Sequence, residues 1–468
     1  MLLYLINPVN PLVSVNKVKQ TYWNRYRVWK PLSLLIIAGL TPPEWDIRII
    51  DENLGIPDYA SLPSPDMVGI TAFSSQAERA YDLAAEYRNR GVTVVMGGIH
   101  ATMCSDEALE RVDAIVMGEA ESIWAQVLED TKKGKLNRIY KGKRLGMDKM
   151  PLARHDLLPS GYKFGLIQTT RGCPLNCNFC SVSSFNGRRY RYRPIENILE
   201  ELKLIKERHV LIVDDNFIGT RKEHICRTKD LLRAMIKAKI DKKWITQVTI
   251  NFADDQELLR LAAKAGCTGV FIGFESINVE GLTEINKSFN FQKGRDFKSS
   301  VHRIKQHGIL VAGSFIMGLD VDKPGIGQQI ASTANYYNID ILNVLFLTPL
   351  PGTKLWEKMK SDGRIAANDF PEDWKYYTLT CPVAKYNHLS WADIINENEI
   401  CSRSFYSYSC IFYRVFQNML HNCKPFITLA SNLSYRSNAV RFYHKKYRGL
   451  DLSKGGNIDQ QIPVIEKV

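Results

Sequence analysis

The chain has 468 residues, of which 45% are hydrophobic and 24% are charged, and its formal net charge is +13. This length and apolar content suffice for two or three buried cores and exclude an intrinsically disordered chain. The first residues lack the basic region and cleavage site of a signal peptide, and apolar runs such as residues 32–40 are too short to span a bilayer, so we expect a cytoplasmic protein.

The positive charge is concentrated near the end of the chain. Residues 401–449 contain eight Lys or Arg and no Asp or Glu, which leaves 54 of the 62 basic residues and all 49 acidic residues elsewhere. Because the excess belongs to one segment, the net charge alone does not predict that the whole protein binds nucleic acid.

Five short apolar runs alternate with helical stretches in the first part of the chain. They are residues 2–7, 47–51, 67–72, 92–97 and 114–118. This rhythm is typical of a parallel α/β sheet, and we predict a Rossmann-like, doubly wound domain over residues 1–145.

Small and polar residues follow these predicted strands. Ligands of parallel sheets bind at the carboxyl ends of the strands, although each such loop taken alone is ordinary turn chemistry. Together the loops predict a ligand site that contains Asn53, Thr71, Ser74, Ser75, Gly97, Gly98, His100, Gly118 and Glu119.

The stretch 132–149 is basic and has no apolar periodicity, and we assign residues 146–161 to a linker. Six strand-like runs follow, with helical patterns between them. They are residues 164–169, 210–213, 247–251, 270–274, 310–317 and 342–348. Six βα units predict a partial (β/α)6 barrel over residues 162–360, with its chemistry at the carboxyl ends of the strands, followed by a mainly helical domain over residues 361–468.

Three cysteines lie just after the first of these strands, at Cys173, Cys177 and Cys180. Three thiolates with this spacing can hold three irons of a 4Fe-4S cluster and leave the fourth iron open. The alternative is a structural zinc site, but such sites use a second cysteine pair, and the other seven cysteines are scattered singly.

The CxxxCxxC pattern, with Phe179 before its last cysteine, resembles the radical S-adenosylmethionine (SAM) enzymes. The resemblance implies that the open iron binds SAM and that the reduced cluster cleaves it to a 5'-deoxyadenosyl radical. It also implies a set of SAM contacts, in which Phe179 lies by the adenine, residues after the second strand meet the amino group, residues after the fourth strand meet the ribose, and the fifth strand runs beside the adenine. The corresponding residues are Phe179, Asp215, Asn216, Glu275, Ser276 and Gly313.

The N-terminal loops resemble the cobalamin-binding domain that precedes the radical domain in one class of this family. Asn53 stands where the mutase-type domain has a histidine, which implies base-off cobalamin without a histidine below cobalt, and His100 is the only rival ligand nearby. The resemblance implies a methyltransferase in which the radical removes hydrogen from an unactivated carbon and methylcobalamin supplies the methyl group.

Three alternatives remain open. Members of the family with the same domains catalyse cyclisation, oxidation or rearrangement without methylation. A transfer-RNA methylthiotransferase needs a second cluster, but only Cys104 precedes Cys173. A non-enzymatic corrinoid-binding protein gives the three cysteines no role. The expected partners are a small-molecule substrate, hydrophobic or anionic, and a one-electron reductant such as flavodoxin or ferredoxin, but not a nucleic acid.

Two basic segments have no assigned role. The run 188–193 is either a solvated face or a binding site for anionic parts of the ligands. The acid-free segment 401–449 contains eleven Phe or Tyr and allows a lid over the active site, an interfacial patch for a lipid-like substrate, a nucleic-acid surface, or a plain helical cap. Peripheral membrane contact is a further partner that this composition allows.

Overall fold

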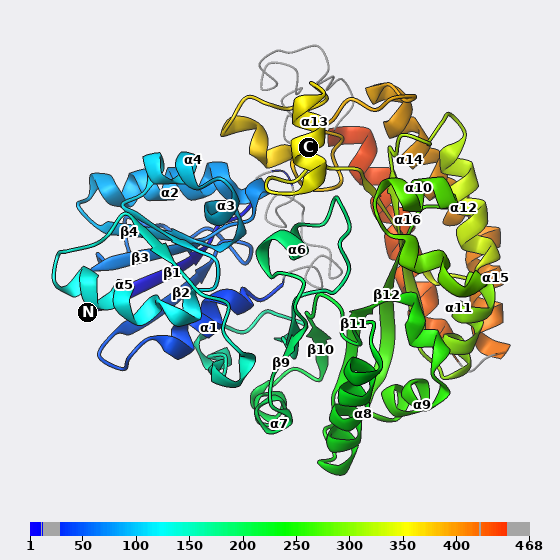
Figure 1. Cartoon of the computed structure of the whole chain (residues 1–468), viewed down its shortest axis with the longest axis horizontal. Helices are drawn as coiled ribbons and strands as arrows, with labels where there is room; N and C mark the ends of the chain where they lie inside the picture. The colour runs from blue at the N-terminus through cyan, green and yellow to red at the C-terminus, as the bar shows by residue number, and fades with distance from the viewer. Residues whose placement is uncertain (11, 13–28, 421–422, 447–468) are drawn as a thin grey trace.

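The computed structural model describes residues 1–10, 12, 29–420 and 423–446, and it contains two parallel sheets that lie beside each other (Figure 1). The N-terminal sheet has the strand order β2-β1-β3-β4-β5-β6. Its strands are β1 (Leu2–Asn7), β2 (Asp46–Asp51), β3 (Met67–Thr71), β4 (Thr93–Gly97), β5 (Ala114–Met117) and β6 (Ile139–Lys141). Its helices are α1 (Leu32–Leu40), α2 (Ala77–Asn89), α3 (Gly98–Met103), α4 (Ser105–Arg111) and α5 (Trp124–Lys132).

Helices cover both faces of this sheet, which explains its nearly continuous apolar strands. Along β1, Tyr4 and Ile6 pack in the cluster that includes α2, α3 and α4, whereas Leu3 and Leu5 pack in the cluster that includes α1 and α5. The five predicted strands match β1 to β5 within a few residues. Strand β6 was not predicted, because only its central residue, Tyr140, is buried.

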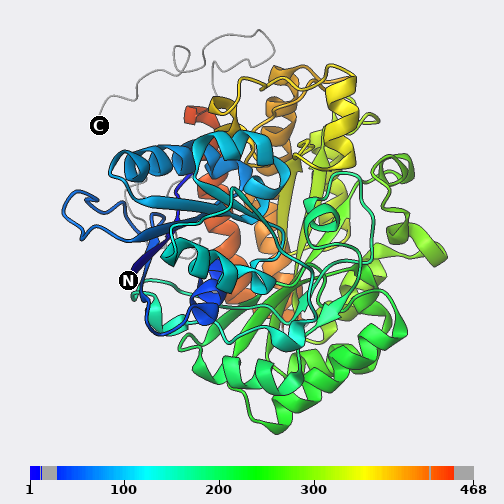
Figure 2. The same cartoon turned by 60° about the vertical axis from the view of Figure 1, so that its left-hand side comes forward.

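The second sheet has the order β14-β13-β12-β11-β10-β7 and is open between its edge strands β7 and β14. Its strands are β7 (Gly165–Ile167), β10 (His209–Ile212), β11 (Lys243–Val248), β12 (Cys267–Glu275), β13 (Leu310–Met317) and β14 (Ile341–Phe346). Helices α7 (Ile195–Leu204), α8 (Lys222–Lys237), α9 (Gln256–Lys264), α11 (Phe297–Gln306) and α12 (Ile326–Tyr336) connect them. Figure 2 shows both sheets after a turn that brings the N-terminal domain forward.

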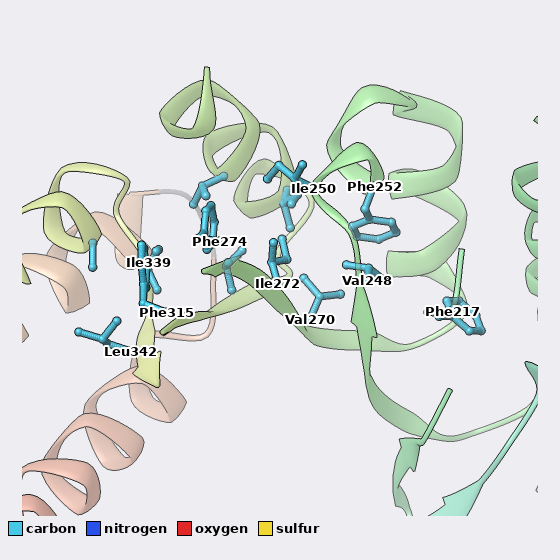
Figure 3. Packing of buried hydrophobic residues seen from close by; sticks show 14 of the residues in the cluster. Phe217, Val248, Ile250, Phe252, Val270, Ile272, Phe274, Phe315, Ile339 and Leu342 are labelled. Atoms are coloured by element: carbon cyan, nitrogen blue, oxygen red, sulfur yellow. The ribbon is translucent and has the colours of Figure 1, made fainter. Parts of the chain in front are cut away.

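Large apolar side chains pack this partial barrel. The alternate residues Val270, Ile272 and Phe274 of β12 enter the core, and the ring of Phe274 stacks on Phe315 with centroids 5.5 Å apart (Figure 3). One strand prediction was wrong in position: the third run was expected at residues 247–251, but β11 begins at Lys243 and Ile250 opens a 3-10 helix. The exposed Lys243 and Gln247 hide the alternation that buries Trp244, Thr246 and Val248.

The last part of the chain returns to both domains. The 3-10 helix Glu372–Tyr376 packs in the core of the N-terminal domain, where Trp374 lies edge-on to His100. Helices α14 (Trp391–Phe405), α15 (Tyr408–Leu420) and α16 (Pro425–Lys446) pack on the barrel instead. The predicted fold class, a Rossmann-like domain, a partial barrel and a helical C-terminal region, is confirmed.

Candidate active site

The three cysteines lie in one loop, residues 172–180, which follows the short strand β8 (Thr170–Arg171). The antiparallel pair of β8 and β9 (Arg191–Tyr192) closes the base of this cysteine loop. Gly172 has a φ of +91°, and a Cβ there would lie 2.3 Å from the carbonyl oxygen of Arg189. Only glycine fits this position, so the turn into Cys173 depends on it.

Hydrogen bonds from the barrel hold both sides of the cysteine loop. The Gly172 amide donates to Asp215 Oδ2 at 2.7 Å on one side. On the other side Asn178 Nδ2 donates to the Glu284 carbonyl at 3.0 Å, and Asn286 Nδ2 donates to the Asn176 carbonyl at 2.7 Å. The backbone of the loop is therefore fixed by protein contacts.

All three thiols are half-buried and free of disulfide bonds. Burial raises the pKa of Cys177 to about 12 and that of Cys180 to about 11, and it also raises the pKa of Cys173. A sheltered trio of thiols in one rigid loop suits an iron-sulfur cluster, since iron binding replaces the protons that burial retains.

Three polar residues follow β10, and each has different hydrogen-bond partners. Asp214 is fully buried, and its two oxygens accept from the amide and the hydroxyl of Thr169 at 2.6 and 2.5 Å. Asp215 accepts from Gly172 and from Asn186 Nδ2. Asn216 donates to Thr249 Oγ1 at 3.3 Å, but its buried Oδ1 has no hydrogen-bond partner.

An unpaired buried oxygen of this kind is costly unless a ligand donates to it. The site therefore fits a ligand with an N–H or O–H group at Asn216, such as the amino group of SAM. Asp215 holds the cysteine loop through its backbone, and its predicted direct contact with SAM stays a prediction.

Glu275 ends β12 in a left-handed conformation, with a φ of +66°. Its Oε1 accepts a hydrogen bond from Lys287 Nζ at 2.5 Å, and both side chains are about nine-tenths buried. Gly273 leaves the room for this pair, because a Cβ there would lie 2.6 Å from Lys287 Nζ. The predicted contact of Glu275 with the ribose of SAM stays a prediction.

Lys287 was not among the site residues predicted from the sequence. Burial lowers the pKa of Lys287, but the neighbouring Glu275 carboxylate and Cys177 thiol outweigh this effect, so its pKa is raised. A single lysine twelve residues beyond a strand end carries no recognisable pattern, and only the fold shows that it is buried near the cysteines.

The other predicted SAM residues are placed as follows. Phe179 packs against the barrel core, and Ser276 Oγ accepts from the Asn278 amide at 3.1 Å. Gly313 faces that core, because a Cβ there would lie 2.7 Å from Ile339. These contacts give Ser276 and Gly313 structural roles, and their contacts with SAM remain predictions.

The predicted cobalamin residues gather at the carboxyl ends of β2 to β5. Gly98 has a φ of +89°, and a Cβ there would lie 2.6 Å from Thr71 Oγ1, so the turn after β4 needs glycine. Gly97 is the residue before α3. The carbonyl oxygen of Ser75 accepts a hydrogen bond from Asn10 Nδ2 at 2.6 Å. Phe73, which sequence analysis did not select, is 67% exposed at this edge. Small residues and one open aromatic ring suit the approach of a large planar cofactor.

Two of the predicted residues bind protein groups instead of facing outward. His100 is fully buried, its Nδ1 lies 3.2 Å from Ser74 Oγ, and its Nε2 lies 2.8 Å from the Tyr81 hydroxyl. Asn53 donates to Asp51 Oδ1 at 2.8 Å. Imidazole nitrogens engaged in this way are poorly placed to ligate cobalt.

The loop after β5 joins the two sites. Gly118 is left-handed, with a φ of +75°, and leads into Glu119, which is 5% exposed. Glu119 pairs with Arg191 and lies 3.3 Å from Arg171 Nη1, and Glu121 pairs with the same Arg171 nitrogen at 2.8 Å.

Arg171 immediately precedes Gly172 of the cysteine loop, so this ion-pair network ties the carboxyl edge of the N-terminal sheet to that loop. Glu119 was predicted to contact cobalamin, but in the structure its carboxylate binds Arg171 and Arg191. The hypothesis that the run 188–193 binds anionic ligands is wrong for Arg191 and Arg193, because both are buried in ion pairs with Glu119 and Glu201.

Comparison with known families agrees with this division of the chain. Residues 167–324 match the profile of the Radical SAM superfamily, and residues 24–128 match the B12 binding domain. The B12 profile includes β2 to β5, and the Radical SAM profile includes β10 to β13 and the cysteine loop.

Two relatives and one solved structure are similar over most of the chain. Bacteriochlorophyllide d C-12(1)-methyltransferase of Chlorobaculum tepidum is 30% identical, over 70% of this chain and 74% of the relative. Anaerobic magnesium-protoporphyrin IX monomethyl ester cyclase of Rubrivivax gelatinosus is 24% identical, over 80% and 74%. The radical SAM methyltransferase TsrM of Kitasatospora setae, solved with cobalamin and a [4Fe-4S] cluster bound, has the same fold, with a TM-score of 0.60, 17% identity and coverage of 78% and 75%.

Proposed function

The chain belongs to the cobalamin-dependent radical SAM enzymes, and we propose that it transfers a methyl group to an unactivated carbon of a small-molecule substrate. Its cofactors are a 4Fe-4S cluster, SAM and cobalamin. When bound, the cluster supplies the electron that cleaves SAM, and the cobalamin supplies the methyl group. The cysteine-bearing loop and the Gly-rich strand ends supply separate places for these groups.

One observation carries the proposal. Arg171, two residues before Cys173, lies within 3.3 Å of Glu119 and 2.8 Å of Glu121 in the loop after β5. The proposed cobalamin edge and the proposed cluster loop are therefore neighbours, linked by buried charges. Methyl transfer to a carbon radical requires that the radical and the methyl donor share one substrate, and this juxtaposition supports such sharing.

Each protein group has a specific task in this proposal. Cys173, Cys177 and Cys180 would ligate three irons. Asn216 Oδ1 would accept the amino group of SAM, and Glu275, oriented by Lys287, would accept the ribose hydroxyls. Asp215 would keep the turn at Gly172 closed, so that the loop does not rearrange when the cluster is reduced.

The partners and compartment are part of the proposal. The substrate would be hydrophobic or anionic, and the electron would come from a small carrier such as flavodoxin or ferredoxin. The cytoplasm is the compartment we propose, since sheltered thiols and an oxygen-labile cluster need a reducing environment.

Anaerobic turnover with SAM deuterated in its methyl group tests the reaction. We expect 5'-deoxyadenosine and S-adenosylhomocysteine to form together, and a product that carries the deuterated methyl group. Formation of 5'-deoxyadenosine without S-adenosylhomocysteine would contradict methylation and favour the non-methylating alternative, which the similarity to the cyclase also supports.

The transfer-RNA and non-enzymatic alternatives are tested in the same assay. A corrinoid-binding protein without catalysis would cleave no SAM after reconstitution. A methylthiotransferase would modify bulk transfer RNA, with affinity that persists as salt is raised.

A further inference from the structure

Helix α15 turns an apolar face to solvent. Its outward residues are 57–63% exposed and recur every three to four positions, so they form one stripe along the helix. We define the C-terminal aromatic face as Tyr408, Phe412, Tyr413, Phe416, Met419 and Leu420. Beyond it, Phe426 at the start of α16 is 84% exposed. A contiguous patch of this kind on a protein surface marks an interaction site.

The side of α15 that packs against α16 and the barrel contains buried polar residues, whereas a surface helix usually buries its apolar side. Arg414 of α15 is 1% exposed and donates to Asn432 Oδ1 of α16 and to the Phe405 carbonyl. Asn418 Nδ2 donates to Asp340 Oδ1 at 2.6 Å. These hydrogen bonds lock the orientation of α15, so its apolar side cannot turn toward the barrel core.

The helix pair is attached at the end of the barrel away from the cysteine loop. Asn432 Nδ2 donates to the Asp340 carbonyl, and the Tyr406 hydroxyl bonds both backbone groups of Leu342, at the amino end of β14. In Figure 1 α15 lies at the outer edge of the molecule, on the side away from the N-terminal domain. The interpretation of this segment as a lid is therefore wrong for the described residues.

The charge around this face points to its partner. Residues 401–449 contain eight basic and no acidic residues; Arg414 is buried, whereas the Arg436 guanidinium lies 4.1 Å from the ring centre of the exposed Tyr408. Two copies of such a segment would repel each other. Within the residues the structure describes, no helix is long and apolar enough to cross a bilayer. A row of aromatic residues with surrounding cations suits the interface of an anionic membrane.

We propose that the C-terminal aromatic face docks on the surface of a bilayer that contains anionic phospholipid, with α15 lying in the plane of the interface. Phe412 and Phe416 enter the acyl boundary, and the basic residues meet the headgroups. The contact leaves the carboxyl ends of the barrel strands uncovered. Docking does not depend on the proposed reaction, because the surface and the active site are at opposite ends of β14.

Flotation of the full-length, reconstituted protein with vesicles tests the proposal. We expect binding to vesicles of phosphatidylcholine with phosphatidylglycerol, little binding to phosphatidylcholine alone, and weaker binding as salt is raised. The double variant Phe412→Ser/Phe416→Ser should lower the bound fraction at least about tenfold, because two large apolar side chains no longer leave water. Both residues are exposed, so the variant should keep its fold and its cleavage of SAM.

A matched control replaces equally exposed apolar residues elsewhere. Ile56→Ser/Leu204→Ser removes side chains that are 55% and 53% exposed, and it should bind vesicles like the unchanged protein. Equal loss in the control, or no flotation of the unchanged protein, would overturn the proposal. A dimer in light scattering that Phe412→Ser/Phe416→Ser converts to a monomer, without vesicle binding, would assign the face to a second copy instead. A photo-crosslinker at Phe412 that captures one protein and no lipid would assign it to a polypeptide partner.

Discussion

The carboxyl ends of both sheets hold buried carboxylates, such as Glu52 and Glu275, but the two ends differ in the turns that follow their central strands. At the barrel end, carboxylates accept backbone or side-chain hydrogen bonds: the half-buried Asp215 holds Gly172, the buried Asp322 holds Gly318, and the buried Glu275 pairs with Lys287. At the N-terminal end, the turn after β4 is shaped by Gly97 and Gly98 and bears few charges.

This difference follows from the two tasks. The barrel end must hold a small cluster and a charged cosubstrate, so its loops are rigid and its charges are compensated. The turn after β4 must admit a broad cofactor, so its residues Gly97 and Gly98 have no side chain. The ion pairs of Glu119 with Arg171 and Arg191 join the N-terminal sheet to the cysteine loop of the barrel.

Loss of one cluster ligand should have the largest effect at the rigid end. Cys177→Ala should lower the rate of SAM cleavage more than about 100-fold, the upper range for loss of a group that only supports a metal ligand. Cys226→Ala, which removes an exposed cysteine of α8, is the control and should leave the rate unchanged. Equal activity of Cys177→Ala and the control, measured as 5'-deoxyadenosine by liquid chromatography, would disprove the assignment.

The second largest effect should follow from removing one charge of the Glu275–Lys287 ion pair. Lys287→Met leaves Glu275 without its cation and should destabilise the barrel by about 3–5 kcal/mol. The double variant Lys287→Met/Glu275→Gln removes both charges and should recover part of this loss. Denaturant unfolding measures both, and a Lys287→Met variant as stable as the unchanged protein would show that the pair is not needed for folding.

One buried carboxyl group at the barrel end, Asp322, should make the stability of the fold depend on pH. Burial raises the pKa of Asp322 to about 6, so between about pH 4 and pH 6 the folded chain keeps a proton that the unfolded chain has lost. This contribution to stability is present below about pH 4 and is lost as the pH rises to about 6, by up to about 3 kcal/mol.

Asp322→Asn should reduce that slope. One oxygen of Asp322 accepts from the amides of Gly318 and Leu319, and an asparagine oxygen can accept both hydrogen bonds without a proton. Unfolding free energies of the cluster-free chain across this pH range measure the effect. A slope as steep as that of the unchanged chain would place the titration elsewhere, for example at Asp214, whose pKa burial also raises to about 6.

The smallest effect should follow from weakening the ion pairs of Glu119 with Arg171 and Arg191. Glu119→Gln weakens the pairs with Arg171 and Arg191, and we expect SAM cleavage to continue while methylated product per 5'-deoxyadenosine falls about tenfold, since a small displacement of the two sites impairs transfer. Glu121→Gln, which loses one pair with Arg171, should change this ratio less. A proportional fall of both products in Glu119→Gln would show that the network supports the cluster alone.

The strands and the cysteine loop were predictable because their patterns are local. Val210 to Ile212 form an apolar run, and three cysteines within eight residues need no tertiary information. The partners of the site residues could not be predicted, because Asp215 and Glu119 bind groups far away in the chain and Glu275 binds a lysine that no motif marks. A carboxylate after a strand predicts a ligand contact and a structural contact equally well, and only the fold separates them. The exposed face of α15 was visible in composition, but its orientation depends on the buried Arg414.

The central claim is that one chain holds a cluster and a cobalamin at two joined but separate sites. Iron and cobalt content of anaerobically reconstituted protein tests it directly, in the unchanged chain, in Cys177→Ala/Cys180→Ala and in Gly98→Val. We predict about four irons and one cobalt in the unchanged chain, cobalt without the cluster iron in the cysteine variant, and iron without cobalt in Gly98→Val. Absence of cobalt from the unchanged chain, or loss of both metals in both variants, would contradict the account.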